Sequence, residues 1–416
     1  MSFLLACSLA LQLGSAPAAS FTFPPPLYPL GNSQPRPASG AGNSPGAPFQ
    51  PTQEIAHQDD FWSNMLVGDA DHDGRQEIVV RYVSSGGPGG VQQVFFYEDD
   101  GSGHFTRVYQ FPLQDGGLLA MGDVDGDGLT DLFYERALGI CHHQFVRREA
   151  SAPGGFPDHE VWAGPKQGNV VDFTAFLADS DGDGLKELVT SDNDLSCGGT
   201  ALEVFESAPG DQMSLVLNLA IPGALGNPVV SDFDLDGRRE IVVAEMFSAQ
   251  LLAFEAVAND TWNPLPPVQH TFFNAYQCTL VERYSPTGAP LVYLAGQMAS
   301  ADYRLQCFAR PAGAPALQLQ HETQLPGLCG ASIAQIASAD LTGTRTPELL
   351  VDRICNGVAV YSLGPGGVPA LIDLPSVPEA IEVVGTRKTA QHSGVIAVGR
   401  ALTTSDPVGK TWLLRQ

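Results

Sequence analysis

A short acidic motif recurs along the 416-residue chain at nearly constant spacing, and it constrains the fold more than any other feature. Four copies of D-x-D-x-D-G-x-x-D/E begin at Asp69, Asp123, Asp179 and Asp232, so their starts lie 54, 56 and 53 residues apart. A degenerate fifth copy begins at Asp340, two periods after the fourth. Self-similarity at a fixed period of this length is typical of chains that stack repeated supersecondary units.

Each period has room for four short strands. In the first unit we expect strands over 61–68, 77–83, 91–98 and 104–111, with the acidic loop between the first two. Two further units without acids, near 283–291 and 385–399, bring the number to seven. The predicted fold class is therefore all-β, a seven-bladed β-propeller of four-stranded antiparallel blades, because a closed ring of such sheets leaves only short edges.

The chain ends predict how the ring closes and where the protein resides. The last unit lacks an outermost strand, which we expect residues 49–57 to supply. Residues 1–19 resemble a signal peptide, 20–53 a Pro/Gly-rich linker, and 54–416 form the propeller. Cys7 follows Leu4-Leu5-Ala6, so a lipoprotein anchor is the alternative to full secretion. The predicted location is extracellular or at the cell surface, and no segment is predicted to span a membrane.

The charge of the chain narrows its partners. A formal net charge of -25 repels nucleic acid and anionic membranes, so neither is expected to bind. Clustered carboxylates repel one another unless a cation lies between them, which favours a cation-binding protein.

The motif itself has the chemistry of a calcium loop. Carboxylates at positions 1, 3 and 5 converge as the loop curls, Gly at position 6 permits the turn, position 7 offers a backbone carbonyl, and the acid at position 9 closes the site. Hard oxygen donors in this number select Ca²⁺ over Zn²⁺. About four structural Ca²⁺ sites are predicted, with the following ligands: Asp69, Asp71, Asp73, Arg75 and Glu77; Asp123, Asp125, Asp127, Leu129 and Asp131; Asp179, Asp181, Asp183, Leu185 and Glu187; Asp232, Asp234, Asp236, Arg238 and Glu240.

Two helical calcium motifs do not fit these loops. An EF-hand needs a Glu at position 12 and flanking helices, whereas position 12 is occupied here by strand residues such as Val80 and Tyr134. A dockerin-like motif fails for the same reason. Solvated turns remain the alternative to metal loops, but four copies in register, each with its acid at position 9, favour metal.

The repeats resemble the FG-GAP/VCBS family, which includes the propellers of integrin α-subunits. The resemblance rests on the Asp loops and covers about residues 55–416. It implies a seven-bladed propeller with Ca²⁺ between the first two strands of several blades, and roles in adhesion, ligand recognition or glycan binding.

Six cysteines remain after Cys7, an even number that suggests disulfides in an exported chain. Fifteen pairings are possible. We expect Cys329 to pair with Cys355, since they lie on adjacent strands of one unit, and we place Cys141 with Cys197 and Cys278 with Cys307.

No nucleophile–base constellation, phosphate loop or redox motif stands out, so no catalytic residue is predicted. We therefore expect a non-catalytic module that recognises a glycan or an extracellular protein. The alternatives are a polysaccharide lyase or hydrolase built on the propeller, and a structural scaffold of a surface assembly. The sequence specifies neither the ligand nor an oligomeric state.

Overall fold

A computed structural model describes most of the chain from residue 49 onwards, all of it within a compact unit, 43–416. The described residues are 49–415 except 59–64, 84–91, 101–103, 114–115, 140–141, 168–174, 195–198, 246–247, 273, 282–287, 299–301, 326–335, 343–346, 353–357, 374–379, 386–394 and 401–407. The expected signal peptide and most of the expected linker lie outside them, as do most of the acid-free loops of the fifth and seventh units. In this part of the chain no helix is long and apolar enough to cross a membrane.

The described strands form six four-stranded antiparallel sheets and one five-stranded sheet. Sheet 1 contains β2 (Met65–Gly68), β3 (Glu77–Val83), β4 (Gln92–Asp99) and β5 (Phe105–Leu113). Sheet 2 contains β6 (Leu118–Gly122), β7 (Asp131–Gly139), β8 (His142–Ala150) and β9 (Pro157–Gln167). Sheet 3 contains β10 (Phe176–Ala178), β11 (Glu187–Asp194), β12 (Gly199–Ala208) and β13 (Gln212–Ala220). Sheet 4 contains β14 (Val229–Ser231), β15 (Glu240–Glu245), β16 (Gln250–Ala258), β17 (Thr261–Pro264) and β18 (Val268–Gln269).

The remaining sheets follow the same plan. Sheet 5 contains β19 (Asn274–Val281), β20 (Leu291–Gln297), β21 (Tyr303–Ala309) and β22 (Gln318–Gln324). Sheet 6 contains β23 (Ile336–Ala339), β24 (Glu348–Asp352), β25 (Val358–Gly364) and β26 (Val368–Asp373), with a 3-10 turn, η1 (Pro365–Gly367), between the last two. Sheet 7 contains β27 (Ala380–Gly385), β28 (Val395–Arg400), β29 (Val408–Arg415) and β1 (Gln50–Gln58).

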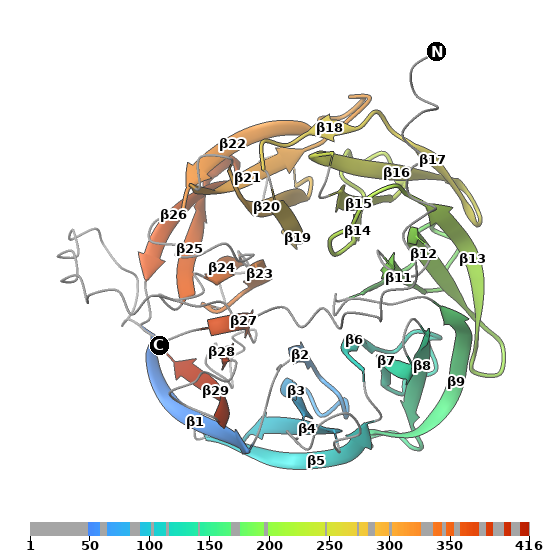
Figure 1. The fold of residues 1–416 in the computed structure, drawn as a ribbon, viewed down its shortest axis with the longest axis vertical. Helices are drawn as coiled ribbons and strands as arrows, with labels where there is room; N and C mark the ends of the chain where they lie inside the picture. The colour runs from blue at the N-terminus through green and yellow to red at the C-terminus, as the bar shows by residue number, and fades with distance from the viewer. Residues whose placement is uncertain are drawn as a thin grey trace, which may run out of the picture. The chain divides into compact units, whose positions relative to one another are not determined.

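The sheets follow one another around a ring, with the first strand of each nearest the centre (Figure 1). Each innermost strand lies against that of the next sheet, in the cyclic order β2, β6, β10, β14, β19, β23, β27 and back to β2. Sequential antiparallel sheets around a ring define a β-propeller. The expected all-β propeller is confirmed.

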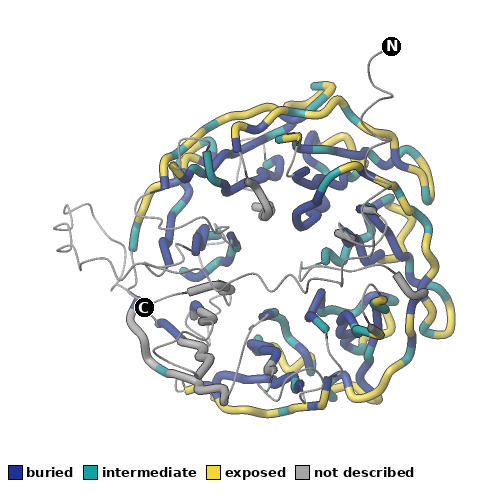
Figure 2. The backbone as a smooth tube through the Cα atoms, in the orientation of Figure 1, coloured by how far each residue is buried: buried dark blue, intermediate teal, exposed yellow. Residues whose placement is uncertain are grey.

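Burial explains why the middle strands read as continuous apolar runs. All six residues of β15 are buried, because neighbouring sheets cover both faces of a propeller blade. The outer strand β22 has no buried residue and follows the exposed rim (Figure 2). The core lies between sheets: Val189 and Leu202 of sheet 3 pack with Ile241 and Val243 of sheet 4.

The N-terminal strand closes the ring, as the sequence predicts. β1 pairs antiparallel with β29, from Gln50 opposite Arg415 to Gln58 opposite Val408, and becomes the outermost strand of sheet 7. Phe49 is buried beside Leu414 and its backbone N–H donates to Asp373 at 2.6 Å. The two ends of the described chain thus share one sheet.

Candidate metal centres in the acidic loops

The four intact loops all join the first and second strands of their sheets. Their closing acids are the first residues of the second strands β3, β7, β11 and β15, namely Glu77, Asp131, Glu187 and Glu240. The fold therefore presents these loops at equivalent positions around the ring.

The loops curl through two left-handed residues. Gly128, at position 6 of the second loop, has φ +87°, and the glycines at this position in the other three loops also have positive φ. The sequence predicts this, because glycine adopts that conformation without steric cost. Position 4 is left-handed as well and includes the non-glycine residues His72 and Leu235, a feature that the motif does not reveal.

Carboxylates inside each loop accept hydrogen bonds from the loop backbone. Asp127 at position 5 accepts from the backbone N–H of Leu129 at 2.7 Å, and the equivalent bond joins Asp183 to Leu185 at 2.8 Å. The same bond joins Asp73 to Arg75 and Asp236 to Arg238, each at 2.8 Å. Position 7 thus supplies a backbone donor to the loop in all four copies, while its expected carbonyl contact to a metal stays a prediction.

The acid at position 9 has a structural role that does not depend on a bound metal. One of its oxygens accepts a hydrogen bond from the backbone N–H of position 2, seven residues earlier. The donor–acceptor pairs are Ala70 to Glu77 (2.5 Å), Val124 to Asp131 (2.8 Å), Ser180 to Glu187, Phe233 to Glu240 (2.8 Å) and, in the degenerate copy, Leu341 to Glu348 (2.8 Å). This contact closes each loop into a ring.

The second oxygen of that acid distinguishes the loops. Glu77 and Glu187 are fully buried, and the second oxygen of each has no hydrogen-bond partner. Each lies in a group whose ligand atoms fall within 4.8 Å of one another: Asp71, Asp73, Glu77 and Glu98 in sheet 1, and Asp179, Asp181, Asp183 and Glu187 in sheet 3. A buried carboxylate oxygen without a donor is costly unless a proton or a cation satisfies it.

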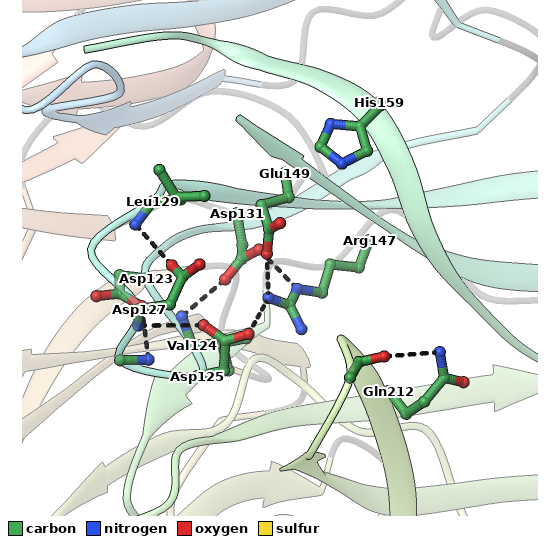
Figure 3. A network of polar contacts seen from close by, with 12 residues as sticks. Asp123, Val124, Asp125, Asp127, Leu129, Asp131, Arg147, Glu149, His159 and Gln212 are labelled. Carbon is green, nitrogen blue, oxygen red and sulfur yellow. Dashed lines mark hydrogen bonds and ion pairs between the residues drawn. The ribbon is translucent and has the colours of Figure 1, made fainter. Parts of the chain in front are cut away.

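In sheet 2 an arginine satisfies the corresponding oxygen. Arg147 on β8 is completely buried, and its Nε donates to Asp131 at 2.6 Å (Figure 3). Its Nη2 contacts both Asp125 and Glu149 at 2.7 Å. One guanidinium therefore pairs with three carboxylates, two from this loop and one from β8.

Sheet 4 reaches the same result from a different part of the chain. Arg310 follows β21 of sheet 5 and extends to the loop of sheet 4, where Nη1 contacts Glu240 and Glu255 at 2.5 Å. Its Nε lies 3.3 Å from Asp234. In the degenerate loop of sheet 6 the hydroxyl of Thr342 donates to Glu348 at 2.9 Å instead.

A second acid faces the closing acid across the sheet, and the motif does not predict it. Strand pairing places Glu98, Glu149, Glu206 and Glu255 directly opposite Glu77, Asp131, Glu187 and Glu240. These residues lie 23 to 29 positions after the first Asp of their loops, an irregular spacing that only the register reveals. They add an acid to each loop.

The next sheet also contributes an acid to the loops of sheets 2 and 3. Asp260, in the turn between β16 and β17, donates its backbone N–H to Asp181 of the preceding sheet at 2.6 Å. Its carboxylate forms a group with Asp181 and Glu206, and Asp211 forms the equivalent group with Asp125 and Glu149. Sequence reasoning missed all of these residues because they belong to a different repeat from the loop they approach.

The electrostatics follow from burial. Burial raises the pKa of Glu77, Glu187 and Glu240 to about 8 and that of Asp131 to about 7, the last against the opposing effect of Arg147. Burial, and then the charge of Asp260, raises the pKa of Glu206 to about 7. A group that is this costly to ionise gains most from a nearby cation.

Among the cysteines, Cys307 is the one whose side chain the structure describes. It is buried on β21 and free, so the expected Cys278–Cys307 disulfide is wrong. The side chains of Cys141, Cys197, Cys278, Cys329 and Cys355 lie outside the described residues.

Comparisons with known proteins place the chain by its fold. No protein-family model and no curated protein matches the sequence. A solved structure of a protein from Lactobacillus plantarum aligns at 11% identity and TM-score 0.50, over 80% of this chain and 94% of that one. A periplasmic gluconolactonase from Pseudomonas aeruginosa aligns at 14% identity and TM-score 0.49, over 85% and 96%. A candidate 6-phosphogluconolactonase from Bacteroides uniformis aligns at 12% identity and TM-score 0.46, over 76% and 98%.

These comparisons correct two expectations. The expected membership of the FG-GAP/VCBS family is wrong, since no family model matches and none of these solved structures carries that description. The expected non-catalytic adhesion or carbohydrate-binding module is not supported either, since the neighbours that carry a named activity are described as lactonases and not as adhesion proteins. At these identities the likenesses show the fold alone.

Proposed function

We propose that the chain is a secreted, calcium-binding hydrolase of small organic substrates, built on a seven-bladed propeller. Two features of the acidic loops and their surroundings support the proposal. The first is the set of buried acids that need a cation, and the second is a carboxyl pair at the junction of sheets 3 and 4. The two features are tested separately.

The metal part rests on Glu77 and Glu187. Each is a fully buried carboxylate with one oxygen held by the backbone and one without a partner, at the edge of an Asp cluster. An all-oxygen site with this many carboxylates suits Ca²⁺ better than Zn²⁺ or Mg²⁺. Extracellular calcium modules bind at roughly 10⁻⁴–10⁻³ M, which fits a secreted protein.

The hydrolase part rests on Glu206 and Asp260. Their carboxylates come from adjacent sheets and meet beside Asp181, and the buried Glu206 Oε2 and Asp260 Oδ1 have no donor from any other described group. Two facing carboxylates of this kind hold one proton between them, so one acts as an acid and the other as a base.

The pair has a defined role in this proposal. Asp260 accepts a proton from a water molecule while the oxygen of that water forms a bond to the carbonyl carbon of the substrate. Glu206 donates its proton to the ring or ester oxygen as the carbon–oxygen bond breaks. Ca²⁺ bound at the Asp179–Glu187 loop would supply positive charge near the developing oxyanion.

The test is a hydrolysis assay on the full chain with Ca²⁺. A gluconolactone is the first substrate to try, after the name of the Pseudomonas aeruginosa neighbour, followed by other lactones and simple esters. We expect Glu206→Gln and Asp260→Asn to lower kcat by about 10²–10⁴-fold. Glu322→Gln, which removes an acid on the outer strand β22, should leave kcat unchanged. Folded, calcium-loaded protein without activity on any of these substrates would refute the hydrolase.

A further inference from the structure

The side chains of two arginines reach acidic loops at points where a cation would otherwise be needed. Arg147 reaches the closing acid of sheet 2 from β8 of the same sheet, and Arg310 reaches that of sheet 4 from the adjoining sheet. The two arginines lie at different positions of their repeats, yet both pair with the acid at position 9 of a loop. The repeat itself therefore does not account for the shared contact.

We propose that Arg147 and Arg310 are built-in substitutes for Ca²⁺, so that the loops of sheets 2 and 4 are metal-free and only those of sheets 1 and 3 bind calcium. This inference rests on the proposed calcium binding and reduces the four expected sites to two.

The contacts of Arg147 carry the argument for sheet 2. Both oxygens of Asp131 are already engaged, one by the backbone N–H of Val124 and the other by Nε of Arg147. Asp125 and Glu149 share Nη2 of the same guanidinium at 2.7 Å. Asp123, Asp125 and Asp127 still bring ligand atoms within 4.8 Å of one another, but a calcium ion there would compete with the fully buried Arg147 for Asp125 and would find no free oxygen on Asp131.

Arg310 makes the corresponding contacts in sheet 4. Glu240 uses one oxygen for the backbone N–H of Phe233 and the other for Nη1 of Arg310. Glu255, which faces Glu240 across the sheet, contacts the same nitrogen, and Asp234 lies beside Nε. The planar guanidinium suits this task because its several N–H groups reach separate carboxylates at once.

The loops of sheets 1 and 3 differ at this point. In sheet 1 Arg75 pairs with Asp73 and Glu98 from the surface, where its side chain is 37% exposed, and leaves the second oxygen of Glu77 without a partner. In sheet 3 position 7 is Leu185, and no described residue forms an ion pair with Glu187. These two loops therefore keep a buried acid whose second oxygen is paired with no cationic side chain of the described residues, and an added cation can satisfy it.

The first test is the calcium stoichiometry of the full wild-type chain, by equilibrium dialysis and metal analysis at saturating Ca²⁺. We expect two ions per chain. Four ions would overturn the inference while leaving the proposed function standing, and no bound calcium would refute the calcium-binding function itself.

Substitutions then locate the sites. Glu187→Gln should reduce the count to one, and Arg147→Met should raise it to three, because Asp125, Asp131 and Glu149 then need a cation. Arg304→Met removes an arginine that pairs with Glu322 away from the loops, so it should keep two ions. A folded Arg147→Met protein that still binds two ions would overturn the role of that arginine.

Arg147→Met removes the partner of three carboxylates and so puts folding without metal at risk, and Arg147→Lys therefore serves as the second variant. Lysine keeps the positive charge, and this variant should keep two ions per chain. Its thermal melting temperature should respond to Ca²⁺ as that of the wild type does, whereas Arg147→Met should show a larger rise with Ca²⁺. Equal calcium responses of Arg147→Met and Arg147→Lys would contradict the proposal that Arg147 takes the place of Ca²⁺.

Discussion

Glu187 accepts a hydrogen bond from the backbone N–H of Ser180, seven residues earlier, and its side chain is completely buried. The same contact recurs in the other intact loops and in the degenerate one. The acid at position 9 therefore has two separable tasks: it holds the loop through one oxygen, and it offers the other to a cation.

Glu187→Gln and Glu187→Ala should separate these tasks. Glutamine keeps a carbonyl acceptor for Ser180, so in chelator its free energy of unfolding should stay close to that of the wild type. Alanine leaves that N–H unsatisfied and should lose about 1–3 kcal/mol. Urea unfolding measures both, and equal losses in chelator would show that the charge, not the backbone contact, holds the loop.

Calcium and pH should act on the same groups. Glu77 and Glu187 have folded-state pKa values of about 8 without metal, above the usual 4.5, so the folded protein holds more protons than the unfolded chain between these values. In chelator the free energy of unfolding should therefore fall as pH rises from about 5 to 8.

Added Ca²⁺ should reverse this trend, because it binds the ionised acids in competition with protons. At ten times Kd each site contributes about 1.4 kcal/mol. Thermal melting at pH 5 and pH 8, with calcium and with chelator, measures the effect. A calcium-induced rise that is no larger at pH 8 than at pH 5 would contradict the role of these acids.

Much of the fold is local enough to be predicted from the sequence. Glu77–Val83 is a strand with the bounds expected from its apolar run, and the left-handed glycine at position 6 follows from the motif. Ring closure by residues near 49–57 follows from the strand missing at the other end of the chain. Each of these inferences needs only a short window or a count of strands.

The parts that were missed depend on long-range register. Glu206 meets Glu187 because β11 and β12 pair in one particular register, and Asp260 reaches the third loop from 79 residues after Asp181. The arginines were missed for the same reason. The family prediction was wrong because it rested on the Asp loops alone. Such a loop motif reflects the geometry of a calcium site, and proteins of different families can share that geometry.

The closing strand gives a third prediction. Phe49 is 2% exposed and packs with Ile396 and Leu414, so Phe49→Ala should lower the free energy of unfolding by about 3–5 kcal/mol. Val108→Ala, on the outer strand β5 where the side chain is 42% exposed, should change it by less than about 0.5 kcal/mol. Chemical unfolding of both variants provides the comparison, and equal small effects would show that the N-terminal strand does not secure the ring.

A buried histidine at the edge of sheet 4 gives the last prediction. His270 is 4% exposed, its Nδ1 accepts from the backbone N–H of Phe272 at 3.2 Å, and Nε2 lies 3.3 Å from the carbonyl oxygen of Glu245. Burial lowers its pKa to about 4, so the folded protein keeps it neutral while the unfolded chain protonates it below about 6.5.

The unfolded state therefore binds the extra proton, and His270 should cost up to about 1.4 kcal/mol for each pH unit as pH falls from 6.5 towards 4. His270→Gln should remove this part of the pH dependence, although the variant loses some packing at every pH. His104→Gln, at an exposed histidine directly before β5, should keep the wild-type slope. Urea unfolding between pH 4 and pH 7 measures all three slopes; the same slope in His270→Gln and the wild type would mean that His270 titrates alike in the folded and unfolded chains.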